Sequence, residues 1–172
     1  ESYNAKDYKK AEPYLKKMVK KNPNDKWALD VLSRLYINTS RHSSAIPLCI
    51  TLIEKYSEKK HKRKLIDCCL ANREFEYIWQ YFPSMVIEDE DEERLERVIS
   101  AYDDKTWPTD FIETLIFNNP NIDRLRHIAI ENLLKNGMIE EAIAKIEDLG
   151  ATEDLSIPLQ LLLAKGYMQS QN

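Results

Sequence analysis

Apolar residues recur along most of the chain at intervals of three and four positions, which is the spacing of one face of an α-helix. Residues 26–52 contain two such stripes, separated by a short polar stretch. The stripes are Leu29, Leu32, Ser33 and Tyr36, followed by Ala45, Cys49 and Leu52. They predict two antiparallel helices that bury these faces against each other.

The second stripe has a copy earlier in the chain. Ala11 precedes Ala45 by thirty-four residues, and in both places apolar residues stand four and seven positions further on. The copy ends at Pro23, which is typical of a turn after a helix. A period of this length indicates a repeat of helix pairs, each of which needs its neighbours to cover its apolar face.

This pattern resembles the tetratricopeptide repeat (TPR), a helix–turn–helix of 34 residues. In that family, positions 4, 7, 8, 11, 20, 24 and 27 carry the packing residues. Residues 26–59 place the two stripes listed above at these positions, with Ser57 at position 32, where the family has proline, and a larger residue than usual at position 27. Residues 8–23 fill positions 17 to 32 of the preceding repeat with Tyr8, Ala11, Leu15, Met18 and Pro23.

Later segments repeat the helical periodicity in a less regular form. Predicted helix pairs cover residues 64–82, 91–120 and 123–150, and a closing helix covers residues 156–168. In residues 123–150 the positions of Gly137, Ala142 and Ile146 again match the family pattern. The prediction is an all-α fold, an α-solenoid of antiparallel helix pairs, and the resemblance implies a right-handed superhelix.

We expect one domain over residues 1–172, with an irregular linker at residues 83–92. Residues 7–25 read as the second helix of a repeat whose first helix has no room ahead of Glu1. We therefore expect the chain to be a fragment of a longer protein. The apolar face of this helix should be partly exposed, which would allow self-association or a partner to bind there.

Composition supports a helical protein. The sequence has only three glycines and 31% charged residues, which argues against hairpin-rich β folds and glycine-rich phosphate loops. The net charge of −4 is uneven, because residues 1–64 hold 16 Lys and Arg against 7 Asp and Glu. The two differently charged ends are either two partner surfaces or unrelated solvated faces.

Two charged runs are candidate signals. The basic run at residues 59–64 is read as a solvated turn, with a nuclear import signal and a nucleic-acid contact as alternatives. The acidic run at residues 88–96 lacks the glycine of a calcium loop and is read as a solvated linker that enters a helix. A docking patch for a basic partner is the alternative for this run.

No combination of residues indicates catalysis or metal binding. Cys49, Cys68 and Cys69 have no zinc-ligand spacing and are read as buried small residues in a reducing compartment, which favours the cytoplasm, with the nucleus as the alternative. His42, His61 and His127 are scattered and are read as turn or surface residues. We expect no enzyme activity, no cofactor, no metal and no membrane span.

The resemblance also implies where a partner would bind. TPR ligands commonly lie in a concave groove lined by the first helices, and the groove positions correspond here to Trp27, Asp30, Arg34, Ile37 and Asn38. An exposed tryptophan beside an arginine is typical of a binding hot spot, although Trp27 could instead pack against the neighbouring repeat. The subset of the family that clamps carboxylates has lysine and asparagine where this chain has Asp30 and Arg34, so binding of an acidic chaperone tail is not supported.

These observations favour a non-catalytic protein–protein interaction or scaffold domain that binds a peptide or helix of a partner at Trp27, Asp30, Arg34 and Asn38. One alternative is an accessory repeat domain of a larger multidomain enzyme. Another is an RNA-binding pentatricopeptide-like repeat protein. An RNA-binding groove should be basic along its length, whereas the C-terminal two-thirds of the chain is acidic, so nucleic acid is an unlikely partner.

Overall fold

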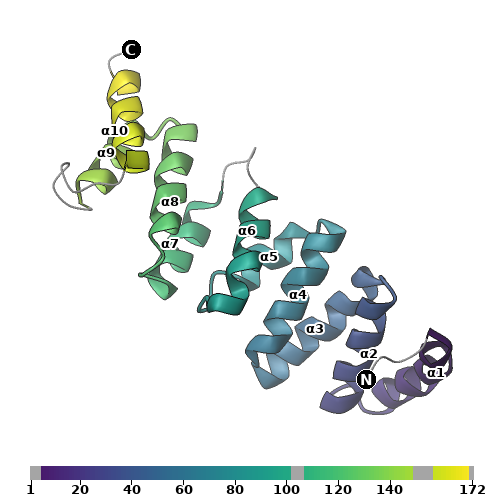
Figure 1. Cartoon of the computed structure of the whole chain (residues 1–172). Helices are drawn as coiled ribbons and strands as arrows, with labels where there is room; N and C mark the ends of the chain where they lie inside the picture. Colours follow the sequence, from purple (N-terminus) through teal and green to yellow (C-terminus); the bar gives the residue numbers. More distant parts are fainter. Residues whose placement is uncertain (1–4, 102–106, 149–156, 171–172) are drawn as a thin grey trace. The chain divides into compact units, whose positions relative to one another are not determined.

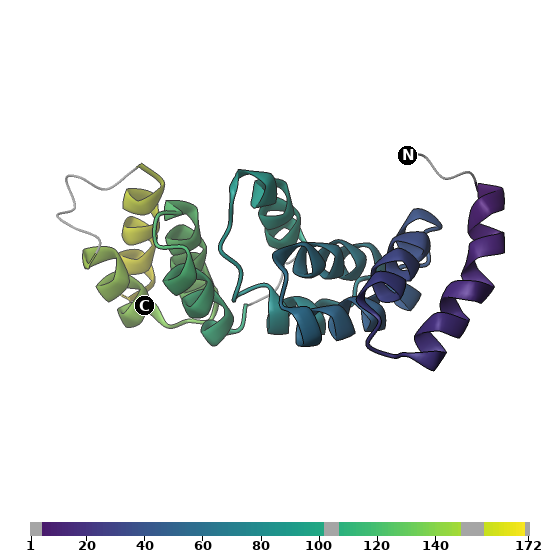
Figure 2. The same ribbon diagram turned by 90° about the horizontal axis from the view of Figure 1, so that it is seen from below.

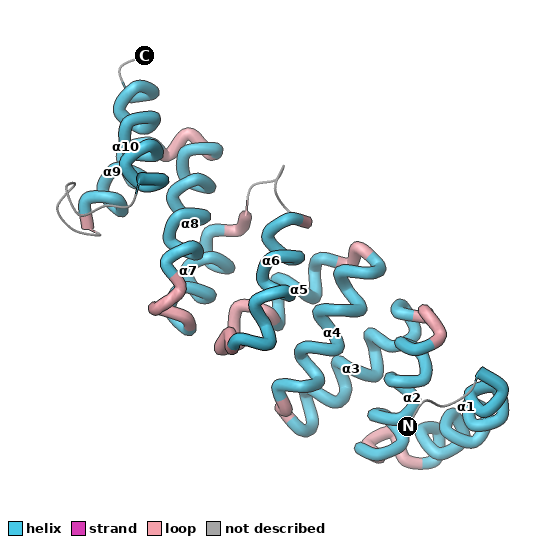
Figure 3. Tube along the Cα trace, in the orientation of Figure 1, coloured by secondary structure: helices cyan, strands magenta, loops and turns pink. Residues whose placement is uncertain are grey.

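The computed structural model describes residues 5–101, 107–148 and 157–170, and within these ranges it contains helices, turns and no strand (Figures 1 and 3). The chain divides into two compact units, Glu1–Ala101 and Tyr102–Asn172, called unit 1 and unit 2 below. The all-α prediction is confirmed. No helix in the described ranges has the length and apolar character needed to cross a membrane.

Unit 1 is a row of helices in which the first five are joined by short turns and pack side by side with their neighbours in the chain (Figure 2). The helices are α1 (Ala5–Lys21), α2 (Lys26–Asn38), α3 (His42–Tyr56), α4 (Lys59–Asn72), α5 (Phe75–Tyr81) and α6 (Glu92–Ser100), with a 3₁₀-helix, η1 (Asp89–Asp91), before α6. Each of α1 to α4 contacts the next helix, and α6 packs against α4. This is the packing of a helical solenoid.

The 34-residue frame places the first helix pair correctly. All seven predicted packing residues of α2 and α3 are buried, and Ala45, Cys49 and Leu52 are fully inaccessible to solvent. Helix α2 begins where Asp25 caps it, because its carboxylate accepts a hydrogen bond of 2.9 Å from the backbone N–H of Ala28. The preceding turn is the predicted Pro23 turn, and α1 packs on α2 through the buried Leu15.

The end of unit 1 is less regular. Helix α5 has only seven residues, and after it the chain runs through turn and extended backbone before η1 and α6 begin. This irregular stretch overlaps the predicted linker at residues 83–92, but Pro83, Met85 and Asp91 in this range are buried. It is therefore a packed part of unit 1.

Unit 2 contains α7 (Thr109–Asn118), α8 (Asp123–Lys135), α9 (Ile139–Glu147) and α10 (Ile157–Ser170). Its core brings together α8, α9 and α10 through Ile130, Leu133, Leu134, Ala142, Ile146 and Leu163. Gly137, with φ of 74°, makes the turn between α8 and α9. Gly166 lets α10 approach α9, since a Cβ there would lie 3.3 Å from Cγ1 of Ile143.

The two helices within residues 91–120, which the periodicity predicts as one pair, belong to different units. Helix α6 packs on α4 within unit 1, whereas α7 packs on α8 within unit 2. Tyr102, one of the predicted facing residues, lies outside the described ranges. Leu149 of the next predicted pair also lies outside them.

Candidate partner-binding face

The predicted site residues lie on one side of α2. Trp27, Asp30, Arg34 and Asn38 are separated by three and four positions, so they follow a single stripe along the helix. Trp27 is 61% exposed, and Arg34 and Asn38 are also exposed or partly exposed. The opposite side of α2 carries the buried residues that hold the helix in unit 1. Within the part of the chain that the structure describes, this stripe therefore faces solvent.

Asp30 lies at the junction between α2 and α4. Its carboxylate accepts a hydrogen bond of 2.6 Å from Nζ of Lys64, which comes from α4, and it pairs at 3.2 Å with Arg34 one turn further along α2. Burial alone would raise the pKa of Asp30, but Lys64 and Arg34 outweigh this effect and the pKa is lowered. Asp30 is therefore ionised and already neutralised by its neighbours.

Asn38 and α1 are connected at the other end of the stripe. The Asn38 side-chain amide donates a hydrogen bond of 2.8 Å to the hydroxyl of Tyr8. Ile37, which the family pattern also placed in the groove, is half-buried. Of the predicted residues, Trp27 and Arg34 are consequently the two whose large side chains project to solvent.

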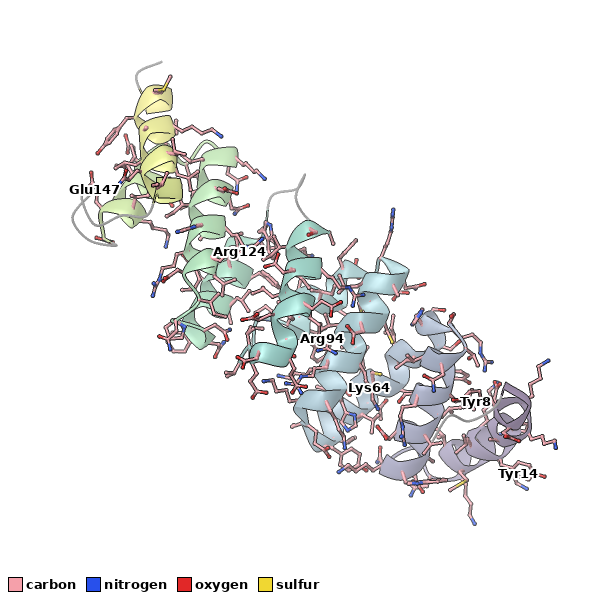
Figure 4. The ribbon with its side chains drawn as sticks, viewed as in Figure 1. Tyr8, Tyr14, Lys64, Arg94, Arg124 and Glu147 are labelled. Carbon is pink, nitrogen blue, oxygen red and sulfur yellow. The ribbon has the colours of Figure 1, made fainter. Side chains whose placement is uncertain are left out.

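The same side of unit 1 continues over α4 and α6 (Figure 4). Asp67 of α4 pairs with Arg94 at 3.0 Å and with Arg97 at 3.3 Å, and both arginines come from α6. Asp30–Lys64 and Asp67–Arg94 are thus two ties between successive first helices of the helix pairs. We call this surface the first-helix face and define it by Trp27, Asp30, Arg34, Asn38, Lys64, Asp67, Arg94 and Arg97.

The basic and acidic runs bind each other. Arg63 donates to both carboxylate oxygens of Asp91, at 2.7 and 3.0 Å, and also reaches Glu88 at 2.9 Å. Lys59 pairs with the same two acids, at 3.2 and 2.8 Å. Arg63 also pairs with Glu90. The ionic contacts hold η1 against the first turns of α4.

Asp91 is the buried residue at the centre of these ion pairs. Its side chain is fully buried, and although burial alone would raise its pKa, the hydrogen bonds from Arg63 and from the Glu88 backbone N–H lower the pKa to about 2. The pKa of Arg63 is raised, mainly by its hydrogen bond with Asp91. The prediction that the two runs are solvated is wrong for Asp91, which is buried, and for Lys59 and Arg63, which are partly buried, whereas Glu88 and Glu90 are exposed.

His61, in the middle of the basic run, does not lie in a turn or on the surface, so that prediction is wrong. The side chain is fully buried between α2 and α4, and neither ring nitrogen forms a hydrogen bond. Nδ1 lies 3.7 Å from Asp30 and Nε2 lies 3.9 Å from Glu58. Burial, followed by the nearby Lys64, lowers the pKa of His61, so the ring is neutral at pH 7.

The cysteines are buried and free, as predicted. Cys49 comes from α3, Cys68 and Cys69 come from α4, and none of the three is accessible to solvent. Hydrogen bonding with Cys49, together with His42, lowers the pKa of Cys68 to about 7, whereas burial raises that of Cys69 to about 12. Among the described residues, no group of three His, Cys, Asp or Glu side chains is arranged to hold a metal ion.

No known protein-family model matches the chain, and no curated protein matches it. One solved structure is similar over 95% of this chain and 74% of its own length: the crystal structure of TTC0263, a thermophilic TPR protein in Thermus thermophilus. The two share 18% sequence identity, with a TM-score of 0.35. A TM-score this low does not establish a common fold, so the helical repeat is assigned from the helix packing of this chain.

Proposed function

We propose that the chain is a non-catalytic protein-interaction scaffold whose first-helix face binds a peptide or helix of a partner protein. The observation that carries this proposal is Trp27. Its side chain is 61% exposed on the same stripe of α2 as the exposed Arg34, while most other large apolar residues of α2 are buried in unit 1. Tryptophan and arginine are the residues most enriched in binding hot spots, where they account for much of the affinity.

The ion pairs along the first-helix face support the same role. Asp30–Lys64 and Asp67–Arg94 join α2 to α4 and α4 to α6, so the surface is held in place before a partner arrives. A surface that is already ordered loses less conformational entropy on binding, which leaves more of the contact energy as affinity. Because Asp30 is neutralised internally, we expect it to position Lys64 and Arg34, while Trp27 and Arg34 make the direct contacts.

Affinity capture with matched variants tests the proposal. The immobilised chain is compared with Trp27→Ala, Arg34→Ala and the control Glu54→Ala, which changes an exposed residue of α3. We expect a partner that the wild type and the control retain and that both face variants lose, with unchanged far-ultraviolet circular dichroism. Retention of every captured protein by both face variants would contradict the proposal.

A second measurement locates the contact directly. A photo-crosslinking phenylalanine derivative, which keeps a large aromatic ring at the position, replaces Trp27 in one variant and Glu54 in another, and the captured partner is irradiated in complex with each. We expect covalent adducts from position 27 and few from position 54. Equal or reversed yields would place the partner on another surface of the chain.

A further inference from the structure

Helix α1 is fixed on α2 by contacts along one of its sides. Leu15 is buried there, Tyr8 accepts the hydrogen bond from Asn38, and Glu12 binds Arg41 through two hydrogen bonds of 3.0 and 2.9 Å. Hydrogen bonds from Arg41 and Lys16 lower the pKa of Glu12 to about 2. Glu12 is therefore ionised, and its charge is balanced by Arg41 and Lys16. These contacts fix which side of α1 faces α2 and which side faces solvent.

The outer side of α1 is basic and largely uncompensated. Six lysines on this helix are exposed: Lys9, Lys10, Lys16, Lys17, Lys20 and Lys21. Lys16 pairs with Glu12 at 2.7 Å, and the other five form no ion pair within the part of the chain that the structure describes. Most basic residues on the other helices of unit 1 are paired, such as Lys59, Arg63, Lys64 and Arg94.

An aromatic side chain stands among these lysines. Lys10, Tyr14, Lys17 and Lys21 are separated by four, three and four positions, so they form one stripe about 16 Å long. Tyr14 is 74% exposed on the outer side of α1 (Figure 4). Met18, four positions further along the helix, is 39% exposed. We call these five residues the lysine stripe. Tyr14 and Met18 are its apolar members, and Lys10, Lys17 and Lys21 are its positively charged members.

We propose that the lysine stripe docks an acidic, amphipathic helical segment of a partner protein. Carboxylates of that segment would face Lys10, Lys17 and Lys21, and an apolar residue would cover Tyr14 and Met18. Residues at this spacing form the ridge that one helix presents to another. The unpaired lysines supply the charge that selects an acidic partner.

The stripe fits a protein segment better than a membrane or a nucleic acid. A helix that lies in a bilayer inserts its apolar face, and the apolar face of α1 is already used against α2. Single-stranded nucleic acids bind along successive exposed aromatic residues, whereas the stripe offers only Tyr14. The surface also lies on α1, apart from the residues of the first-helix face, so it does not depend on the function proposed above.

Fluorescence anisotropy with defined probes tests this docking site. The main probe is a labelled helical peptide, about five turns long, in which one glutamate, one leucine and two further glutamates follow one another at intervals of four, three and four positions, so that the leucine faces Tyr14. The comparison probes are a single-stranded oligothymidine of similar length and vesicles of phosphatidylcholine with phosphatidylserine. We expect the peptide to bind the full chain, with an affinity that falls as salt is added.

Variants identify the surface that the peptide uses. Lys17→Glu with Lys21→Glu should weaken peptide binding about tenfold, because two attractions become repulsions. The control Lys55→Glu reverses an exposed lysine on α3 and should leave the affinity unchanged, as should Trp27→Ala. Tyr14→Ser should weaken binding of this peptide more than binding of a polyglutamate peptide that lacks the leucine.

A variant that alters folding is recognised by circular dichroism, and Lys17→Gln with Lys21→Gln then replaces it as a milder change. Absence of peptide binding to the wild-type chain would overturn the proposal. An unchanged affinity for the peptide in the chain that carries both Lys17→Glu and Lys21→Glu would also overturn it. Binding of the oligonucleotide or the vesicles through these lysines, with no binding of the peptide, would also overturn it and would assign the stripe to that ligand.

Discussion

Three helices of unit 1 are followed by a residue with left-handed backbone conformation, and none of these residues is glycine. Ser40 has φ of 55°, Ser57 of 51° and Arg73 of 58°. A side chain in this conformation crowds the backbone, which is why helix ends usually carry glycine there. Each of these residues therefore lowers the free energy of unfolding of unit 1, and a residue without a Cβ at the same position should raise it.

Replacing Arg73 with glycine should stabilise the protein. Arg73 caps α4 and is exposed, so the change relieves the backbone without removing a packed side chain. We expect the free energy of unfolding to rise by about 0.5–1 kcal/mol in urea titrations. Arg73→Ala is the control, since alanine keeps the Cβ that causes the crowding. An equal gain from alanine would show that the left-handed backbone is not the cause.

His61 should make the protein less stable in weak acid. Its pKa is lowered in the folded state from the ordinary value of 6.5, so when the pH falls below that value the unfolded chain binds a proton before the folded chain does. The stability contribution is complete above this pH and is lost as the pH falls toward the lowered pKa. Asp30, Glu58, Lys60 and Lys64 are the charged groups that act on the ring.

Urea midpoints at pH values of about 7.5, 6.5 and 5.5, on both sides of the ordinary histidine pKa, measure this effect. The free energy of unfolding should fall with a slope of at most about 1.4 kcal/mol per pH unit in the wild type. In His61→Gln the slope over this range should be smaller, even if the variant is less stable at every pH. Identical slopes in the two proteins would exclude His61 as the titrating group.

At the scale of the helices, the sequence pattern is informative wherever local periodicity decides the outcome. Leu32 and Cys49 are buried because the repeat places them on facing sides of α2 and α3, and predicting this needs only the spacing. The pairing of Arg63 with Asp91 cannot be found in this way. The two residues are 28 positions apart, and their contact depends on how the irregular chain after α5 returns to α4.

The same limit applies to the candidate site. The family pattern places Trp27 and Arg34 on an exposed stripe, which is where they lie. It gives no sign that Asp30 is bound by Lys64, since that contact joins two repeats. The composition of the basic run likewise does not reveal that His61 is buried, because its burial follows from the position at which α4 begins.

The Arg63–Asp91 pair should be the main tie between η1 and α4. Asp91→Asn keeps the shape of the side chain but removes its charge, so the guanidinium of Arg63 keeps only the exposed Glu88 and Glu90 as acidic partners. We expect a loss of about 2 kcal/mol in the free energy of unfolding. Glu93→Gln, at an exposed position of α6, is the control. A loss below about 0.5 kcal/mol for Asp91→Asn, the lower end for an ordinary hydrogen bond, would contradict this role.

At the scale of the whole molecule, the two units are expected to fold separately. Unit 1 has its own buried core, which includes Leu52, Leu65 and Ile78, and unit 2 has the core around Ile130 and Ile146. Residues 1–101 and 102–172 can be expressed as two proteins. We expect a helical circular dichroism spectrum from each, and a sum that reproduces the spectrum of the full chain.

Thermal melts of the two pieces complete this comparison. A cooperative transition for residues 1–101 alone would show that unit 1 is stable without unit 2. An unfolded spectrum for either piece would show that the units depend on each other, which would favour the single domain that the sequence suggested.

The burial of all three thiols has a practical consequence for studying this chain. Because Cys49, Cys68 and Cys69 are inaccessible, a single cysteine introduced at an exposed position such as Ser43 would react with a maleimide dye while the native thiols are shielded. Pairs of introduced cysteines, one in each unit, would then accept spin labels or fluorophores in otherwise unaltered protein. Distances between such labels would show directly how the two units are arranged in solution.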